Sequence, residues 1–158
     1  MIPGPYHEIR DAIRALCAQY PDEYFRKVDE QRGYPEAFVD ALLGAGWLSA
    51  MIPEAYGGAG LGLGAASVIM EQINRCGGNS GAVHGQMYNM GTLLRHGSDA
   101  QKRRYLPRIA EGKLRIQSMA VTAPTPGPDT TKVKATAGKG DGSKHVHRTQ
   151  ACTGSDQH

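Results

Sequence analysis

The sequence has few cysteines, no long apolar run and little net charge. Three cysteines occur in 158 residues, at Cys17, Cys76 and Cys152. An odd number of widely spaced cysteines is typical of free thiols in a reducing compartment and argues against a disulfide framework. No run of 18 apolar residues is present, so we expect no transmembrane helix. Residues 1–11 contain neither an apolar signal core nor an Arg-rich presequence, and a cytoplasmic location is the default expectation.

Several functional classes are excluded by what the sequence does not contain. A net charge of +3 is too small to favour nucleic-acid binding. No Ser/His/Asp or Walker A pattern is present, and the glycines of 57–62 follow no strand long enough for a dinucleotide fold. His145, His147, Cys152 and His158 lack the spacing of a tight zinc site, so we expect no metal. The apolar share of 40% is that of an ordinary globular domain.

Apolar residues at helical spacing dominate the first two thirds of the chain. They predict six helices, at about 6–19, 21–33, 35–44, 64–75, 80–96 and 98–112. Ser98 and Gln101 have the spacing of a capping box at the start of the sixth helix. Pro107 predicts a kink or a break of that helix into two short pieces. Short connections between the helices predict an up-and-down bundle.

The pattern changes after residue 114. Residues 115–122 alternate between polar and apolar side chains, which predicts a strand, and a loop rich in Pro and Gly follows. After residue 122 the only branched aliphatic side chains are Val133 and Val146. Such a composition buries too little apolar surface to offset about 1–2 kcal/mol of backbone ordering per residue. We therefore predict at most one weak strand at 131–137 and disorder beyond it.

The sequence thus predicts a mainly α fold, with about six helices in an up-and-down bundle, then one or two short β segments and a disordered tail. Three parts are expected. Residues 1–113 form an N-terminal helical domain, 114–137 begin an incomplete β-domain, and 138–158 are the tail.

Four segments resemble, in the same order, those of the acyl-CoA dehydrogenase family, over roughly residues 8–122. They are IPEAYGGAGLG at 52–62, HGQMYNMGTLLRHGS at 84–98, QKRRYLPRIAEGKL at 101–114, and the AVT of 120–122 followed by a loop ending G-x-D. The last segment is similar to the family's flavin-binding segment, which usually reads V-T-E-P-x-x-G-S-D. A Gly-rich loop alone is a weak signal, whereas the ordered set is specific.

The resemblance implies an enzyme that binds FAD and oxidises an acyl-CoA to a trans-2-enoyl-CoA, with electrons passed to an electron-transfer flavoprotein. It implies that FAD is contacted by five residues of the flavin-binding segment: Met119, Val121, Thr122, Gly127 and Pro128. The alternative is that these residues only pack in an ordinary strand or form a turn, without contacting a cofactor. No residue matches the family's catalytic Glu, so none of the residues in this chain is expected to be catalytic.

Two departures from the family pattern weaken the expected FAD site. Ala123 stands where the family usually has Glu, and Pro128 stands where it has Ser or Thr. Proline offers neither a hydroxyl nor an N–H to the cofactor. We therefore expect weak FAD binding by this chain.

The resemblance also places His84 and Tyr88 at the wall of the acyl pocket, one turn apart on one helix face. The alternative is that Tyr88 is a core residue and His84 faces solvent.

The loss of strand-forming residues in the tail leads to a further hypothesis, that the chain is a fragment, truncated or frameshifted after about residue 135. The alternatives are a non-catalytic helical module, which pairs with a full-length relative, and a non-functional truncated gene product. A homo-oligomer is compatible with each of these hypotheses.

Overall fold

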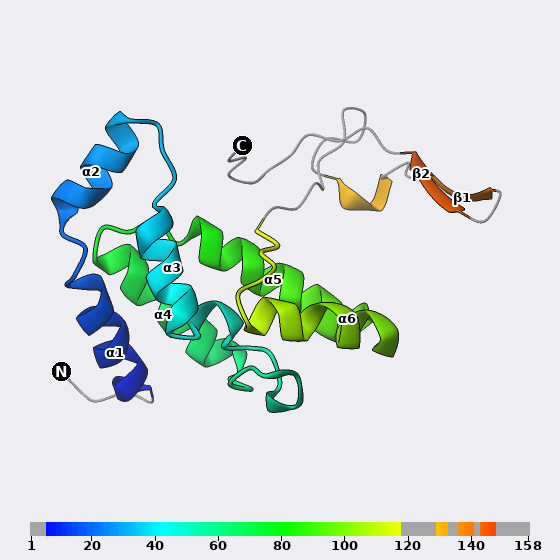
Figure 1. Cartoon of the computed structure of the whole chain (residues 1–158), viewed down its shortest axis with the longest axis horizontal. Helices are drawn as coiled ribbons and strands as arrows, with labels where there is room; N and C mark the ends of the chain where they lie inside the picture. The colour runs from blue at the N-terminus through cyan, green and yellow to red at the C-terminus, as the bar shows by residue number, and fades with distance from the viewer. Residues whose placement is uncertain (1–5, 118–128, 133–135, 141–142, 148–158) are drawn as a thin grey trace.

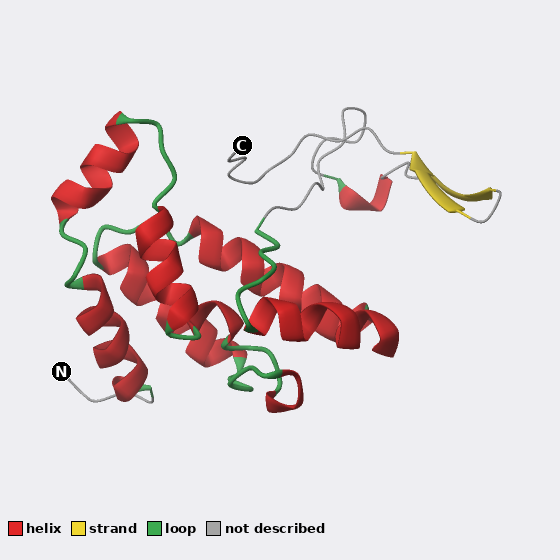
Figure 2. Ribbon diagram, viewed as in Figure 1, coloured by secondary structure: helices red, strands yellow, loops and turns green. Residues whose placement is uncertain are grey.

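The computed structural model describes residues 6–117, 129–132, 136–140 and 143–147 of the chain. The described part contains six α-helices, which form one bundle (Figures 1 and 2). In chain order they are α1 (His7–Cys17), α2 (Asp22–Glu30), α3 (Glu36–Gly44), α4 (Leu63–Arg75), α5 (Gly81–His96) and α6 (Asp99–Ala110). The predicted mainly α fold with six helices is confirmed.

The core lies where α1, α3, α4, α5 and α6 meet. α1 packs along α4, and α5 lies against both α4 and α6. The largest core side chains are all at most 1% exposed: Ile13, Phe38, Leu42, Leu48, Ile52, Ile69, Ile73, Met90, Leu106 and Ile109. These residues recur at helical spacing within each segment, which is the pattern that predicted the bundle.

α2 has no fully buried residue and is attached to the bundle through aromatic rings. Tyr24 and Phe25 of α2 meet Tyr20 and Phe38 edge-to-face, with ring centroids 5.1–5.2 Å apart. Edge-to-face pairs of this kind add about 0.5–1.5 kcal/mol each beyond the area they bury. The aromatic group therefore holds α2 where the aliphatic core does not reach.

The predicted capping box of α6 is confirmed. The Ser98 hydroxyl oxygen accepts the Gln101 N–H at 3.3 Å, and the Gln101 side chain accepts the Ser98 N–H at 2.8 Å. Pro107 predicted a kink or a break of this helix; the break is wrong, because α6 runs through Pro107 to Ala110. Pro107 falls in the last turn, where it costs one hydrogen bond, and the buried side chains of Leu106 and Ile109 hold that turn in place.

Two short 3-10 turns interrupt the predicted loop between α3 and α4, η1 (Trp47–Ser49) and η2 (Glu54–Tyr56). Ile52 between them is fully buried, and its carbonyl accepts the Gly60 N–H at 2.8 Å. The loop is thus attached to the bundle at its centre.

The tail contains a short turn η3 (Thr130–Lys132) and two antiparallel strands, β1 (Thr136–Gly140) and β2 (Ser143–His147). In their register Thr136 faces His147, and Gly140 faces Ser143; Figure 1 shows this hairpin away from the helices. The weak strand predicted at 131–137 overlaps β1, which begins at Thr136, and β2 lies within the predicted 138–158 tail. The predicted division of the chain at residues 113 and 137 stays a prediction.

The hairpin forms because paired strands satisfy each other's backbone groups locally, whatever their side chains bury. The sequence between the two strands is Asp141-Gly142, a dipeptide that favours two-residue hairpin connections.

Candidate functional site

The five predicted flavin contacts, Met119, Val121, Thr122, Gly127 and Pro128, lie outside the residues that the structure describes. The described residues that lead to them are 115–117, hereafter the approach segment. This segment has no regular secondary structure and runs across α5 and past α3. Side chains from three parts of the bundle hold it.

Arg115 joins the approach segment to α3. Its guanidinium donates to the Glu36 carboxylate at 2.8 Å and also pairs with the carboxylate of Asp40. Burial lowers the pKa of Arg115, but the hydrogen bond to Glu36 and the two negative charges outweigh it, so the pKa is raised overall. Arg115 is therefore permanently charged. Its side chain is 27% exposed, but those of Glu36 and Asp40 are 60% and 53% exposed, so solvent screens both pairs.

Both backbone groups of Ile116 are bonded to side chains of α5. The Ile116 N–H donates to the Gln86 side-chain oxygen at 3.1 Å. The Asn89 amide donates to the Ile116 carbonyl at 3.1 Å and to the Gly85 carbonyl at 2.8 Å. Helix side chains thus take the place of the neighbouring strand that would bond this peptide in a sheet.

Gly85 lets the approach segment lie directly on α5. A Cβ at Gly85 would fall 2.1 Å from the Gln117 carbonyl oxygen, far inside contact distance. On the other side, the Tyr34 hydroxyl donates to the Gln117 side-chain oxygen at 2.9 Å. Burial raises the pKa of Tyr34, so this hydroxyl keeps its proton and remains a donor at neutral pH.

Two buried amide nitrogens beside the approach segment have no acceptor among the described residues, Gln86 Nε2 and Gln117 Nε2. Gln86 is fully buried. An unpaired buried donor costs about 1–3 kcal/mol. One amide of α5 and one of the approach segment could therefore donate to an electron-rich group that reached them.

His84 and Tyr88 lie side by side on α5, with ring centroids 5.0 Å apart and edge-to-face. Both line a cavity of about 410 Å³ between α4 and α5, together with Met51, Leu63, Met70 and Met87 among others. His84 is exposed and Tyr88 is half-buried. The structure thus brings the two predicted pocket residues together at one largely apolar cavity.

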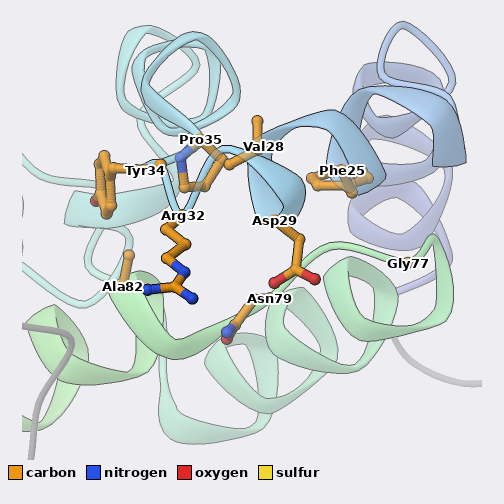
Figure 3. Close-up of a pocket in the computed structure, with 10 residues that line it drawn as sticks. Phe25, Val28, Asp29, Arg32, Tyr34, Pro35, Gly77, Asn79 and Ala82 are labelled. Atoms are coloured by element: carbon orange, nitrogen blue, oxygen red, sulfur yellow. The ribbon is translucent and has the colours of Figure 1, made fainter.

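A second cavity, of about 570 Å³, lies between α2 and the start of α5 (Figure 3). Asp29, Arg32 and Asn79 line it, with Tyr34 and Phe25 among the apolar and aromatic lining. Arg32 has a positive φ of 49°, which is uncommon for a residue with a side chain. The sequence pattern did not single out any of these residues.

Within the described ranges, no group of three His, Cys, Asp or Glu side chains is arranged to hold a metal ion. No helix of the described residues is both long and apolar enough to span a bilayer.

The family model of the acyl-CoA dehydrogenase N-terminal domain matches residues 6–113, which are more than half of the chain. The chain belongs to the acyl-CoA dehydrogenase family. The predicted family is therefore confirmed, and the match ends two residues before the approach segment.

Curated relatives of this acyl-CoA dehydrogenase chain are much longer than it is. It is 40% identical to the mitochondrial isovaleryl-CoA dehydrogenase of Oryza sativa subsp. japonica over 92 residues, 57% of this chain and 22% of that protein. It is 30% identical to a probable acyl-CoA dehydrogenase of Mycobacterium tuberculosis over 154 residues, 96% of this chain and 39% of that protein. The chain thus spans between about a fifth and two fifths of these relatives' length.

Solved structures of the family share the fold. An acyl-CoA dehydrogenase from Geobacillus kaustophilus superimposes with a TM-score of 0.80 at 23% identity, over 94% of this chain and 39% of that one. At this identity the likeness concerns the fold alone.

Proposed function

We propose that this chain supplies the N-terminal helical part of an FAD-dependent acyl-CoA dehydrogenase, which oxidises an acyl-CoA to a trans-2-enoyl-CoA. The family match over residues 6–113 carries this proposal. An electron-transfer flavoprotein as acceptor, a role in fatty acid metabolism, a homo-oligomeric state and a cytoplasmic location are expectations that go with it. No residue here matches the family's catalytic Glu, so the chain by itself is expected to be inactive.

The described residues are compatible with an FAD site at the end of the approach segment. Two amide nitrogens that lack an acceptor among the described residues, Gln86 Nε2 and Gln117 Nε2, suit an electron-rich partner. When bound, FAD would accept the hydride from the substrate's β carbon. Met119, Val121 and Thr122 would hold the flavin by packing and by the Thr122 hydroxyl. Gly127 would allow close backbone approach, whereas Pro128 withholds a donor, so the affinity should be weak.

The cavity at His84 and Tyr88 is proposed to receive the acyl tail. Its lining is largely apolar, and its volume of about 410 Å³ is within the range of small-molecule pockets. The Tyr88 ring limits how far a tail extends along α5, since His84 packs against its edge. The role of these two residues is thus to bound the pocket by shape.

Residues 123–147 are proposed to begin the β-domain of the family in the correct reading frame. The alignment with the Mycobacterium relative covers 96% of this chain, so it continues well past residue 135. The paired strands β1 and β2 lie in the same stretch. An out-of-frame tail would have no reason to align with a relative, and this argues against the frameshift hypothesis.

A flavin titration of the purified 158-residue chain tests the proposed function. We expect FAD fluorescence to be quenched with saturation, at a dissociation constant above about 1 μM because the Pro128 donor is missing. No turnover of an acyl-CoA is expected with an artificial electron acceptor. A chain that gives no saturable quenching up to millimolar FAD would instead be the non-catalytic helical module.

A further inference from the structure

We propose that Gln86, Asn89, Tyr34 and Arg115 are positioning residues, which fix the register of the flavin-binding segment from the helical side before any cofactor binds. This inference rests on the proposed function, since it assigns these residues to the site formed by the residues after 117. None of the four is expected to touch the reacting atoms.

The register is fixed at a single peptide. Gln86 accepts the Ile116 N–H, and Asn89 donates to the Ile116 carbonyl, so both hydrogen-bonding groups of this residue are committed to α5. A shift of the chain by one residue would break both bonds at once. Every later residue of the proposed flavin-binding segment would then be displaced along the chain by one position.

The neighbouring residues oppose the same shift. Arg115 is held by Glu36 and Asp40 of α3, on an element separate from α5. Gln117 is held by the Tyr34 hydroxyl, and its carbonyl lies so close to α5 that only glycine is accommodated at position 85. Three consecutive residues are thus bonded to three different parts of the bundle.

Packing alone would not select Gln86. Its neighbours on the buried face of α5 are Val83, Met87 and Met90, and an apolar side chain of the same length would fill the site. Gln86 instead leaves a buried amide nitrogen without an acceptor among the described residues, which is unfavourable. The hydrogen bond from the Ile116 N–H to the Gln86 side-chain oxygen offsets this cost. What this bond provides is a fixed position for Ile116 on α5.

The test compares Gln86→Met with Gln72→Met in the full 158-residue chain. Gln72 is also a buried glutamine, 2% exposed, but it lies on α4 and accepts from Arg14, far from the approach segment in sequence and contact. Both variants replace a buried amide by a side chain of similar volume. Amide hydrogen exchange at Ile116 is measured by NMR, alongside FAD affinity and the thermal midpoint.

We expect Gln86→Met to speed exchange at Ile116 by about tenfold and to weaken FAD binding by a similar factor. Gln72→Met should leave the exchange rate at Ile116 and the FAD affinity close to the wild-type values, even if it lowers the thermal midpoint. If Gln86→Met fails to fold, Asn89→Leu removes the other bond to Ile116 and is expected to weaken FAD binding in the same way.

Unchanged exchange at Ile116 in Gln86→Met overturns the inference, as does an equal increase in both glutamine variants. Faster exchange with unchanged FAD affinity overturns it too, since the register would then be irrelevant to the cofactor. Failure of the wild-type chain to bind FAD would refute the proposed function and the cofactor role of these residues together, whatever the exchange rates.

Discussion

At the scale of single residues, Gly85 is the point in the candidate site where the approach segment comes closest to α5. Its hydrogen atom faces the Gln117 carbonyl oxygen where a Cβ would lie only 2.1 Å away. The neighbour in this contact is backbone, which is itself held by the bonds of Ile116 on α5. Little movement is therefore available to relieve a larger side chain.

Gly85→Ala should therefore destabilise the chain by about 1–3 kcal/mol, because the added methyl group forces the approach segment off α5. Gly91 on the same helix is the matched control, since a Cβ there meets nothing within 4 Å. Gly91→Ala should stabilise by up to about 1 kcal/mol through helix propensity. Urea unfolding measures both variants, and equal effects would contradict the close contact.

Cys17 shows a second effect of burial on a single residue. Burial, together with a hydrogen bond to the Cys76 thiol, raises the pKa of Cys17 from its ordinary value of 9.0 to about 12. Above pH 9 the unfolded chain therefore releases this proton while the folded chain keeps it. The resulting contribution to stability is complete below pH 9 and is lost as the pH rises towards 12.

The free energy of unfolding should accordingly fall more steeply between pH 9 and 11 in the wild type than in Cys17→Ala. Cys17→Ala lowers stability at every pH by leaving a small cavity, so the slopes are compared and not the absolute values. Parallel curves for the two proteins would show that Cys17 ionises equally in the folded and unfolded states.

At the scale of elements, α6 depends on its N-terminal cap. Among the described helices it is the one with a side-chain cap bond. Ser98→Ala should cost about 1 kcal/mol, because the Gln101 N–H loses its acceptor. Ser98→Asp retains an acceptor at the same position and should stay within about 0.5 kcal/mol of the wild type. Thermal unfolding distinguishes the two variants, and equal losses would contradict the capping role.

Local sequence patterns predict some of these elements and not others. Helical periodicity places α4 and α5, and the spacing of Ser98 and Gln101 predicts the capping box, since both signals are local. The pairing of β1 with β2 depends on backbone hydrogen bonds between the two strands, which apolar content does not report. Local patterns thus succeed where neighbours in sequence decide the structure.

The contacts of the approach segment could not be predicted in this way. Tyr34 and Gln117 are 83 positions apart, and Arg115 reaches partners 75 and 79 positions earlier. No local pattern pairs residues at such separations. One signal was available, because Gln86 is a polar residue on a helix face otherwise lined by Val83, Met87 and Met90.

At the scale of the whole molecule, the question is how well this chain binds flavin. Under the proposed function, Pro128 stands where the family usually has a Ser or Thr donor, so Pro128→Ser should tighten FAD binding by about tenfold or more. Pro126→Ser is the control, as it relaxes the same loop without restoring that serine. Flavin fluorescence titrations compare the three proteins. Equal gains in both variants would show that loop stiffness limits the affinity instead of the missing donor.

The bonds of residues 115–117 also constrain the order of events during synthesis. Their partners on α3 and α5 leave the ribosome first, so a docking surface is complete before the approach segment emerges. Docking then adds three residues to an assembled surface, and the long sequence separations of these bonds are already spanned by the packing of the helices. A chain that ends at Lys113 should therefore fold into the bundle by itself, with the amide groups of Gln86 and Asn89 accessible to water.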